Sequence, residues 1–192
     1  MAESRGLGDV YKRQVIGTEI VKVDSFLNQQ LDVNLFQAIG REIHQRFKND
    51  KIDKILTIEA SGIAIATVTA MEYGNIPLVY AKKAKPNTMT DDFYKAAVKS
   101  FTKGTVSEVV VSRKYLQPGE KILIIDDFLA HGEAMQGLIS LCRQAQCEVV
   151  GLCAVIEKSF QGGGDKLRKA GYHLESLARI KAIADGKIVF AD

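Results

Sequence analysis

Two adjacent carboxylates, Asp126 and Asp127, come directly after a run of apolar residues at positions 122–125. Such a run is typical of a buried strand, and ligands of open α/β sheets bind at the carboxyl ends of the strands. Vicinal carboxylates placed there could bind the two hydroxyls of a ribose, or a Mg²⁺ ion carried by a polyphosphate. The alternative is a helix cap with a solvated acid pair. The order of strand, acids and glycine-containing loop favours a binding site.

A short loop and a predicted helix follow the acid pair. The helix is expected to begin near Gly132, and a helix N-terminus offers unpaired backbone N–H groups together with the positive end of the helix dipole. The segment is therefore predicted to hold a phosphate, through Ala130, His131, Gly132, Glu133 and Ala134. We expect the Glu133 side chain to point away from the anion. His131 could donate a ring N–H to it or could be an exposed loop residue.

A second predicted junction between a strand and a helix carries Glu59, Ala60, Ser61 and Gly62. The small residues allow an anion to approach the backbone N–H groups at the start of the helix. A simple serine cap followed by a permissive glycine is the alternative.

The elements that must position these residues alternate along the chain. Short β-branched runs and longer helical stretches follow one another from Lys54 onward, which predicts an α/β fold with a mostly parallel, twisted sheet flanked by helices. Helices are expected after an Asp32 cap, at 61–73 and at 132–145, and strands at 54–58, 77–80, 106–112, 121–125 and 148–156. Residues 172–177 and 187–190 are weaker strand candidates. Residues 81–92 and 159–164 are expected to be loops.

Length and composition fit one globular domain. The chain has 192 residues, of which 46% are hydrophobic and 26% charged, and a net charge of +3 that does not by itself indicate nucleic-acid binding. Residues 1–14 have no apolar periodicity, so we expect an unstructured leader followed by a single domain at 15–192. No apolar run is long enough to span a membrane and no secretory signal is evident, which predicts a cytoplasmic protein. The three cysteines show no zinc spacing and are expected to be small buried side chains.

The segment 122–134, Ile-Leu-Ile-Ile-Asp-Asp-Phe-Leu-Ala-His-Gly-Glu-Ala, resembles the phosphoribosyl pyrophosphate (PRPP) signature of the type I phosphoribosyltransferases. Its loop is similar to the Ala-Asn-Gly-Gln-Ala version of bacterial xanthine phosphoribosyltransferases, with His131 and Glu133 as departures. Further segments that resemble that family are 22–28, 59–63, 100–103, 155–160 and 174–179. The resemblance covers about residues 21–190.

This resemblance implies that Asp126 and Asp127 are the catalytic acids, which bind the ribose hydroxyls. It implies that the loop 130–134 holds the 5′-phosphate, that Ser61 and Gly62 face the pyrophosphate, and that Mg²⁺ arrives with PRPP. Residues 81–100 would form a mobile loop over the reaction, where Lys82, Lys83 or Lys103 could neutralise the pyrophosphate. A small hood made by the N- and C-terminal segments and a homodimer are also implied.

The base needs a pocket of its own. Lys158 could donate to a purine carbonyl and Phe160 could supply an aromatic face. By the resemblance, Val21 and Asn28 also line the pocket. The implied reaction converts xanthine and PRPP to xanthosine 5′-monophosphate and pyrophosphate, with no nucleic-acid or membrane partner.

Two alternatives remain at this point. The same reaction could use hypoxanthine, guanine or another base, although Lys158 argues against adenine because an exocyclic amine would face a cation. A non-catalytic, purine-sensing regulator on the same fold would carry a basic DNA-binding extension, and the chain offers only a short polar leader.

Overall fold

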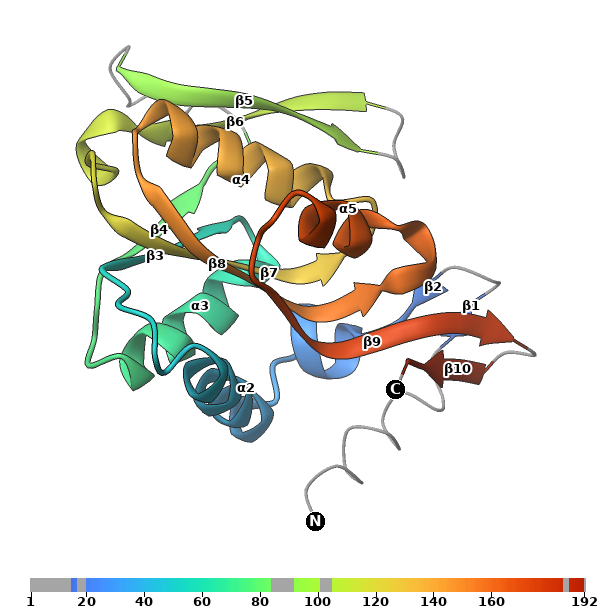
Figure 1. The fold of residues 1–192 in the computed structure, drawn as a ribbon. Helices are drawn as coiled ribbons and strands as arrows, with labels where there is room; N and C mark the ends of the chain where they lie inside the picture. The colour runs from blue at the N-terminus through green and yellow to red at the C-terminus, as the bar shows by residue number, and fades with distance from the viewer. Residues whose placement is uncertain (1–14, 17–19, 84–91, 101–104, 185–186, 192) are drawn as a thin grey trace.

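A six-stranded sheet forms the centre of the protein in a computed structural model that describes residues 15–16, 20–83, 92–100, 105–184 and 187–191 (Figure 1). Its strand order is β10-β9-β8-β7-β3-β4. Neighbouring strands are parallel except β10, which runs antiparallel to β9 at one edge. The strands are β3 (Lys54–Ile58), β4 (Leu78–Ala81), β7 (Lys121–Leu129), β8 (Glu148–Lys158), β9 (Leu174–Ala184) and β10 (Lys187–Phe190).

Helices cover both faces of this sheet. On one face lie α2 (Val33–Arg46), α3 (Ser61–Glu72) and a short π-helical turn, η1 (Asp24–Asn28). The other face carries α4 (Glu133–Gln144), the short α5 (Gly163–Lys169) and an antiparallel pair, β5 (Phe93–Ser100) and β6 (Thr105–Ser112). Two single turns, η2 (Arg113–Tyr115) and η3 (Ser159–Gln161), precede β7 and α5.

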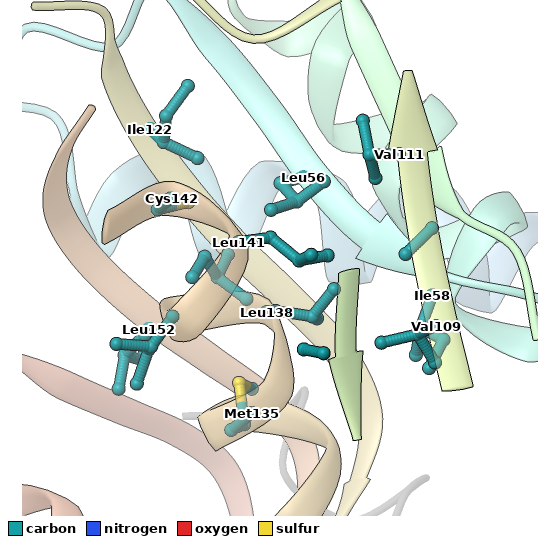
Figure 2. Packing of buried hydrophobic residues seen from close by; sticks show 14 of the residues in the cluster. Leu56, Ile58, Val109, Val111, Ile122, Met135, Leu138, Leu141, Cys142 and Leu152 are labelled. Atoms are coloured by element: carbon teal, nitrogen blue, oxygen red, sulfur yellow. The ribbon is translucent and has the colours of Figure 1, made fainter. Parts of the chain in front are cut away.

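The core on the α4 face is continuous from the sheet to the β5–β6 pair. Leu138 and Leu141 of α4 meet the strand residues Leu56 and Ile122, and Val109 of β6 closes the layer from outside (Figure 2). All five are fully buried. Burial of each such side chain favours folding by about 1.5–3 kcal/mol, so α4 is fixed firmly on the sheet.

The core on the other face joins the ends of the chain. Val21 of β2 (Ile20–Val21), which pairs with β1 (Val15–Ile16), is buried in the same cluster as Ile180 of β9, and Ile188 of β10 packs against that cluster. Segments from the N- and C-terminal parts of the described chain thus contribute to the same core cluster, and the hood itself stays a prediction.

Most of the predicted elements are confirmed, including the cap of α2, where the Asp32 side chain accepts a hydrogen bond from the Leu35 N–H at 3.1 Å. Of the cysteines, Cys142 and Cys153 are buried as expected, whereas Cys147 is half-buried. Residues 1–14 lie outside the described residues, so the leader stays a prediction. Within the described part, none of the helices is long and apolar enough to cross a membrane.

Two expected loops are wrong in part. The mobile loop implied for 81–100 cannot extend beyond residue 92, because Phe93–Ser100 is a strand along its whole length, with Tyr94, Ala96 and Val98 turned into the core. Residues 84–91 of that loop lie outside the described part. In the expected loop 159–164, Gly162 is the N-cap of helix α5, and Gly163 and Gly164 are the first two residues of that helix.

Candidate functional site

The acid pair forms the sixth and seventh residues of the nine-residue strand β7, which continues beyond the expected strand end to Leu129. Asp126 is 5% exposed and Asp127 is half-buried. The backbone N–H of Asp127 donates to the Asp126 carboxylate at 2.9 Å. Burial, followed by the neighbouring charge of Asp127, raises the pKa of Asp126 well above its ordinary value. The two acids therefore differ in their surroundings: Asp126 is buried, and Asp127 is half-buried.

The loop after β7 has the geometry of an anion site. Gly132 has φ +90°, a left-handed conformation that a glycine adopts without a Cβ penalty, and α4 begins directly after it. The hydrogen bonds of the helix start with Gln136 N–H donating to Gly132 O at 2.9 Å. The N–H groups of residues 133–135 consequently have no acceptor within the helix and can serve an anion.

Gly163, the first residue of α5, packs against the backbone of this loop. Its N–H donates to Ala130 O at 3.1 Å, and a Cβ added at Gly163 would collide with the backbone of Ala130, His131 and Gly132. The first residue of α5 is therefore packed directly against the loop that was predicted to bind phosphate. The sequence signal for this contact is the run of three glycines.

The start of α3 meets the acid pair. A Cβ added at Gly62 would lie 3.6 Å from an Asp126 carboxylate oxygen and would collide with the Thr57 hydroxyl. Thr57 is fully buried, and among the described residues its hydroxyl has no hydrogen-bond partner. The two strand–helix junctions that the sequence singled out, at Ser61–Gly62 and after Asp126–Asp127, thus lie next to each other at the carboxyl end of the sheet.

Of the three candidate lysines, Lys83 lies near the junction at Ser61–Gly62. The backbone N–H of Lys83 donates to the Glu59 carboxylate at 2.6 Å, and the positive charge of Lys83 acts to lower the pKa of Asp126. Lys82 instead bridges to Val110 of β6 and lies with its Nζ 5.9 Å from the centre of the Tyr80 ring. Lys103 lies outside the described residues.

The residues expected to bind the base fall into exposed and buried groups. Lys158, the last residue of β8, places its Nζ 5.6 Å from the centre of the Phe128 ring. Phe160 is 41% exposed, and Asn28 is exposed at the end of η1. Val21 is buried in the core cluster against which Phe128 packs, so Val21 and the Phe128 ring belong to the same face of the sheet.

A charged group that the sequence interpretation missed lies beside Lys158. Glu157 is fully buried, yet it is held by a fork of two hydrogen bonds from Arg168 at 2.9 and 2.7 Å, and Ser176 donates to it at 2.6 Å. Burial alone would raise its pKa, but the hydrogen bonds from Arg168 and Ser176 outweigh burial and lower it. The sequence feature that could have identified Glu157 is a carboxylate at the end of an apolar strand.

Comparison with known proteins agrees with this arrangement. Residues 23–178 match the family described as phosphoribosyl transferase domain. A xanthine phosphoribosyltransferase of Acinetobacter baumannii is 51% identical over 176 residues, which cover 92% of either chain. One of Clostridioides difficile is 50% identical over 176 residues, covering 92% of this chain and 93% of that one.

The fold is also found among solved structures. An adenine phosphoribosyltransferase from Thermoanaerobacter pseudethanolicus superposes with a TM-score of 0.75 at 19% identity, covering 91% of this chain and 98% of that one. At that identity the likeness concerns the fold alone. With the family match over most of the chain and relatives about 50% identical, the protein belongs to the phosphoribosyltransferase family and has its type I fold.

Proposed function

We propose that the protein is a xanthine phosphoribosyltransferase, which converts xanthine and PRPP to xanthosine 5′-monophosphate and pyrophosphate. The observation that carries the proposal is the acid pair Asp126–Asp127 followed directly by an anion loop, with the start of α3 beside it. This arrangement suits a ribose with a phosphate at one end and a pyrophosphate at the other. The relatives that are about 50% identical are named for xanthine.

In the proposed reaction a ring nitrogen of the base attacks C1 of the ribose. The bond from C1 to the pyrophosphate oxygen breaks, pyrophosphate leaves with that electron pair, and the imidazole-ring proton of the base passes to the departing pyrophosphate or to water. Because the transition state has oxocarbenium character, the enzyme mainly positions the reactants and stabilises separating charge. The half-buried Asp127 carboxylate would face the positive ring, and Asp126 would complete the acceptors for the hydroxyls.

The phosphates are assigned to backbone groups. The loop of Ala130, His131, Gly132, Glu133 and Ala134 holds the 5′-phosphate, and Ser61 and Gly62 hold the pyrophosphate. Of the two candidate lysines that the structure describes, Lys83 is assigned to the leaving group, because its backbone N–H donates to Glu59 beside the Ser61–Gly62 junction.

Mg²⁺ fits the donor set at this site. Carboxylate oxygens are the ligands that Mg²⁺ prefers, and two vicinal carboxylates supply only part of the octahedral shell. Among the described residues no group of three or more His, Cys, Asp or Glu side chains could hold a metal ion, so the ion would arrive bound to PRPP rather than be held by a protein ligand set. When bound, it adds positive charge where the pyrophosphate departs.

The base side relies on side chains. Lys158 donates to the 6-oxo group, Phe160 offers a ring face, Asn28 pairs with a polar edge of the purine, and Val21 contributes to the apolar wall. Location in the cytoplasm and assembly as a homodimer, which the family resemblance implies, belong to this proposal, and sedimentation of the purified chain would test the dimer.

A turnover assay with PRPP and four bases (xanthine, hypoxanthine, guanine and adenine) tests the proposal. We expect the highest kcat/KM with xanthine and the lowest with adenine. A preference for hypoxanthine or guanine would keep the reaction and change the substrate. Binding of a purine with no product from any base would support the regulator instead.

A further inference from the structure

Glu157 and Lys158, the last two residues of β8, lie on opposite faces of the sheet. Side chains alternate between the faces of a strand, so Glu157 and Lys158 point in opposite directions. Glu157 turns toward α5, where Arg168 holds it, while Lys158 lies over Phe128 on the face of η1 and β2. Anything that fixes Glu157 therefore also fixes the backbone from which Lys158 projects.

Glu157 is held by groups from three elements. Arg168 of α5 forks onto both carboxylate oxygens, and Ser176 of β9 donates to Oε2 at 2.6 Å. The Ser159 hydroxyl lies 3.5 Å from Oε1, and Arg179 Nε lies 3.4 Å from Oε2. A bidentate guanidinium–carboxylate pair defines orientation as well as distance.

Glycines extend this contact to the phosphate side. A Cβ added at Gly164 would collide with the Glu157 carboxylate and lie 2.7 Å from Arg168 Nη1. The preceding residue, Gly163, rests against the backbone of Ala130 and Gly132. The first two residues of α5 therefore make separate contacts. Gly163 packs against the loop 130–134, and Gly164 packs against the Glu157 carboxylate.

We propose that the Glu157–Arg168 ion pair is a positioning device, which fixes Lys158 for the base and ties it through α5 to the phosphate loop. The inference rests on the proposed function, in which Lys158 contacts the base. Neither Glu157 nor Arg168 needs to touch a substrate. A fully buried carboxylate costs desolvation energy, and apolar residues of similar volume often stabilise a fold equally well, so stability alone gives little reason for this pair.

A double-mutant cycle on KM for xanthine tests the proposal, with Arg168→Met, Lys158→Met and the double variant. If Arg168 acts through Lys158, Arg168→Met raises this KM about tenfold in the wild-type background and changes it less than about twofold in the Lys158→Met background. Additive effects in the two backgrounds would overturn the proposal. So would an unchanged KM in Arg168→Met with only a lower melting temperature.

A matched control separates positioning from stability. Lys54 forms a comparable ion pair with Glu120 at 2.6 Å, at the amino end of β3. Lys54→Met should lower the melting temperature and leave KM for xanthine unchanged. If Arg168→Met fails to fold, Arg168→Lys keeps the charge without the fork and Ser176→Ala removes one donor; both should raise KM for xanthine by a smaller factor.

Amide hydrogen exchange gives a readout that does not depend on turnover. In Arg168→Met, the amides of residues 158–162 should exchange faster than in wild type, while those of 54–58 stay unchanged. Equal exchange at 158–162 overturns the positioning role whatever the activity. Failure of the wild type to use any oxo-purine would contradict the proposed function instead, and the exchange result would still decide whether the pair anchors this segment.

Discussion

The N–H of Gly163 donates to the carbonyl of Ala130 at 3.1 Å, and this hydrogen bond joins the first residue of α5 to the loop after β7. Both partners are backbone groups, so neither can move aside as a flexible side chain would. Two glycines therefore constrain the conformation of the loop 130–134. Gly132 adopts the left-handed conformation at the start of α4, and Gly163 packs against the backbone of the loop.

Gly163→Ala is expected to weaken PRPP binding. The added Cβ would collide with backbone atoms of Ala130, His131 and Gly132, so the loop must shift. We expect KM for PRPP to rise at least about tenfold, because a misplacement of about 1 Å in a positioning element can cost about a hundredfold. Initial-rate kinetics at saturating xanthine measure this.

The control is Gly151→Ala, whose Cβ would collide with the Phe47 ring in the core. It should lower thermal stability and leave KM for PRPP unchanged. Equal effects of the two substitutions on this KM would contradict a specific role of Gly163.

Replacement of both acids, Asp126→Asn with Asp127→Asn, should abolish turnover and leave the fold intact. Amides keep the size of the side chains but supply no negative charge to the ribose or to Mg²⁺, and loss of such stabilisation costs about 10²–10³-fold in kcat. Steady-state kinetics and circular dichroism check the two parts. Glu108→Gln, on β6 with an exposed side chain, is the matched control, and full activity in a folded double variant would remove the assignment.

Asp126→Asn alone should stabilise the protein at neutral pH. Burial and the charge of Asp127 raise the pKa of Asp126 in the folded state, so folding binds this proton more tightly and stability is lost as the pH rises through that pKa. The variant lacks this loss. Its carbonyl oxygen can still accept from the Asp127 N–H.

Thermal melts between pH 5 and pH 8 measure the effect. The melting temperature of Asp126→Asn should exceed that of wild type at the upper end of this range, and the difference should shrink as the pH falls toward the ordinary carboxyl range. A difference that is constant over this range would show that Asp126 does not titrate there.

Lys158→Ala should lower kcat/KM for oxo-purines about ten- to a hundredfold, because a charge-assisted hydrogen bond contributes roughly 1.5–3 kcal/mol. KM for PRPP should change little, since its phosphates are assigned to other residues. Lys166→Ala, an exposed lysine of α5, is the control. If Lys158→Ala weakened PRPP and left xanthine untouched, Lys158 would belong to the phosphate site.

The sequence predicted the parts of the fold that depend on local pattern. The strand at Lys54–Ile58 has the expected bounds, and α2 begins after the expected Asp32 cap. The acid pair and the anion loop follow the expected strand because strand, loop and helix are contiguous in the chain. Their roles toward substrate remain predictions.

Contacts between distant segments could not be predicted in this way. Glycine disfavours helix, so Gly162–Gly164 indicated a loop; the close approach of Gly163 to Ala130 and of Gly164 to Glu157 outweighs that preference. Strand Phe93–Ser100 had a usable signal, the alternation of buried Tyr94, Ala96 and Val98 with exposed residues. Its lysines and its position after a polar stretch concealed that signal.

The anion loop has a consequence for how such a protein can change over generations. Its hydrogen-bond donors at residues 133–135 are main-chain N–H groups, which a point mutation cannot remove except by introducing proline. In the proposed function the base side depends on side chains such as Lys158, which one nucleotide change can replace. If the proposed assignments hold, single substitutions can change the base that is bound, whereas the phosphate contacts can be weakened only indirectly, by substitutions such as Gly163→Ala that displace the main chain of the loop.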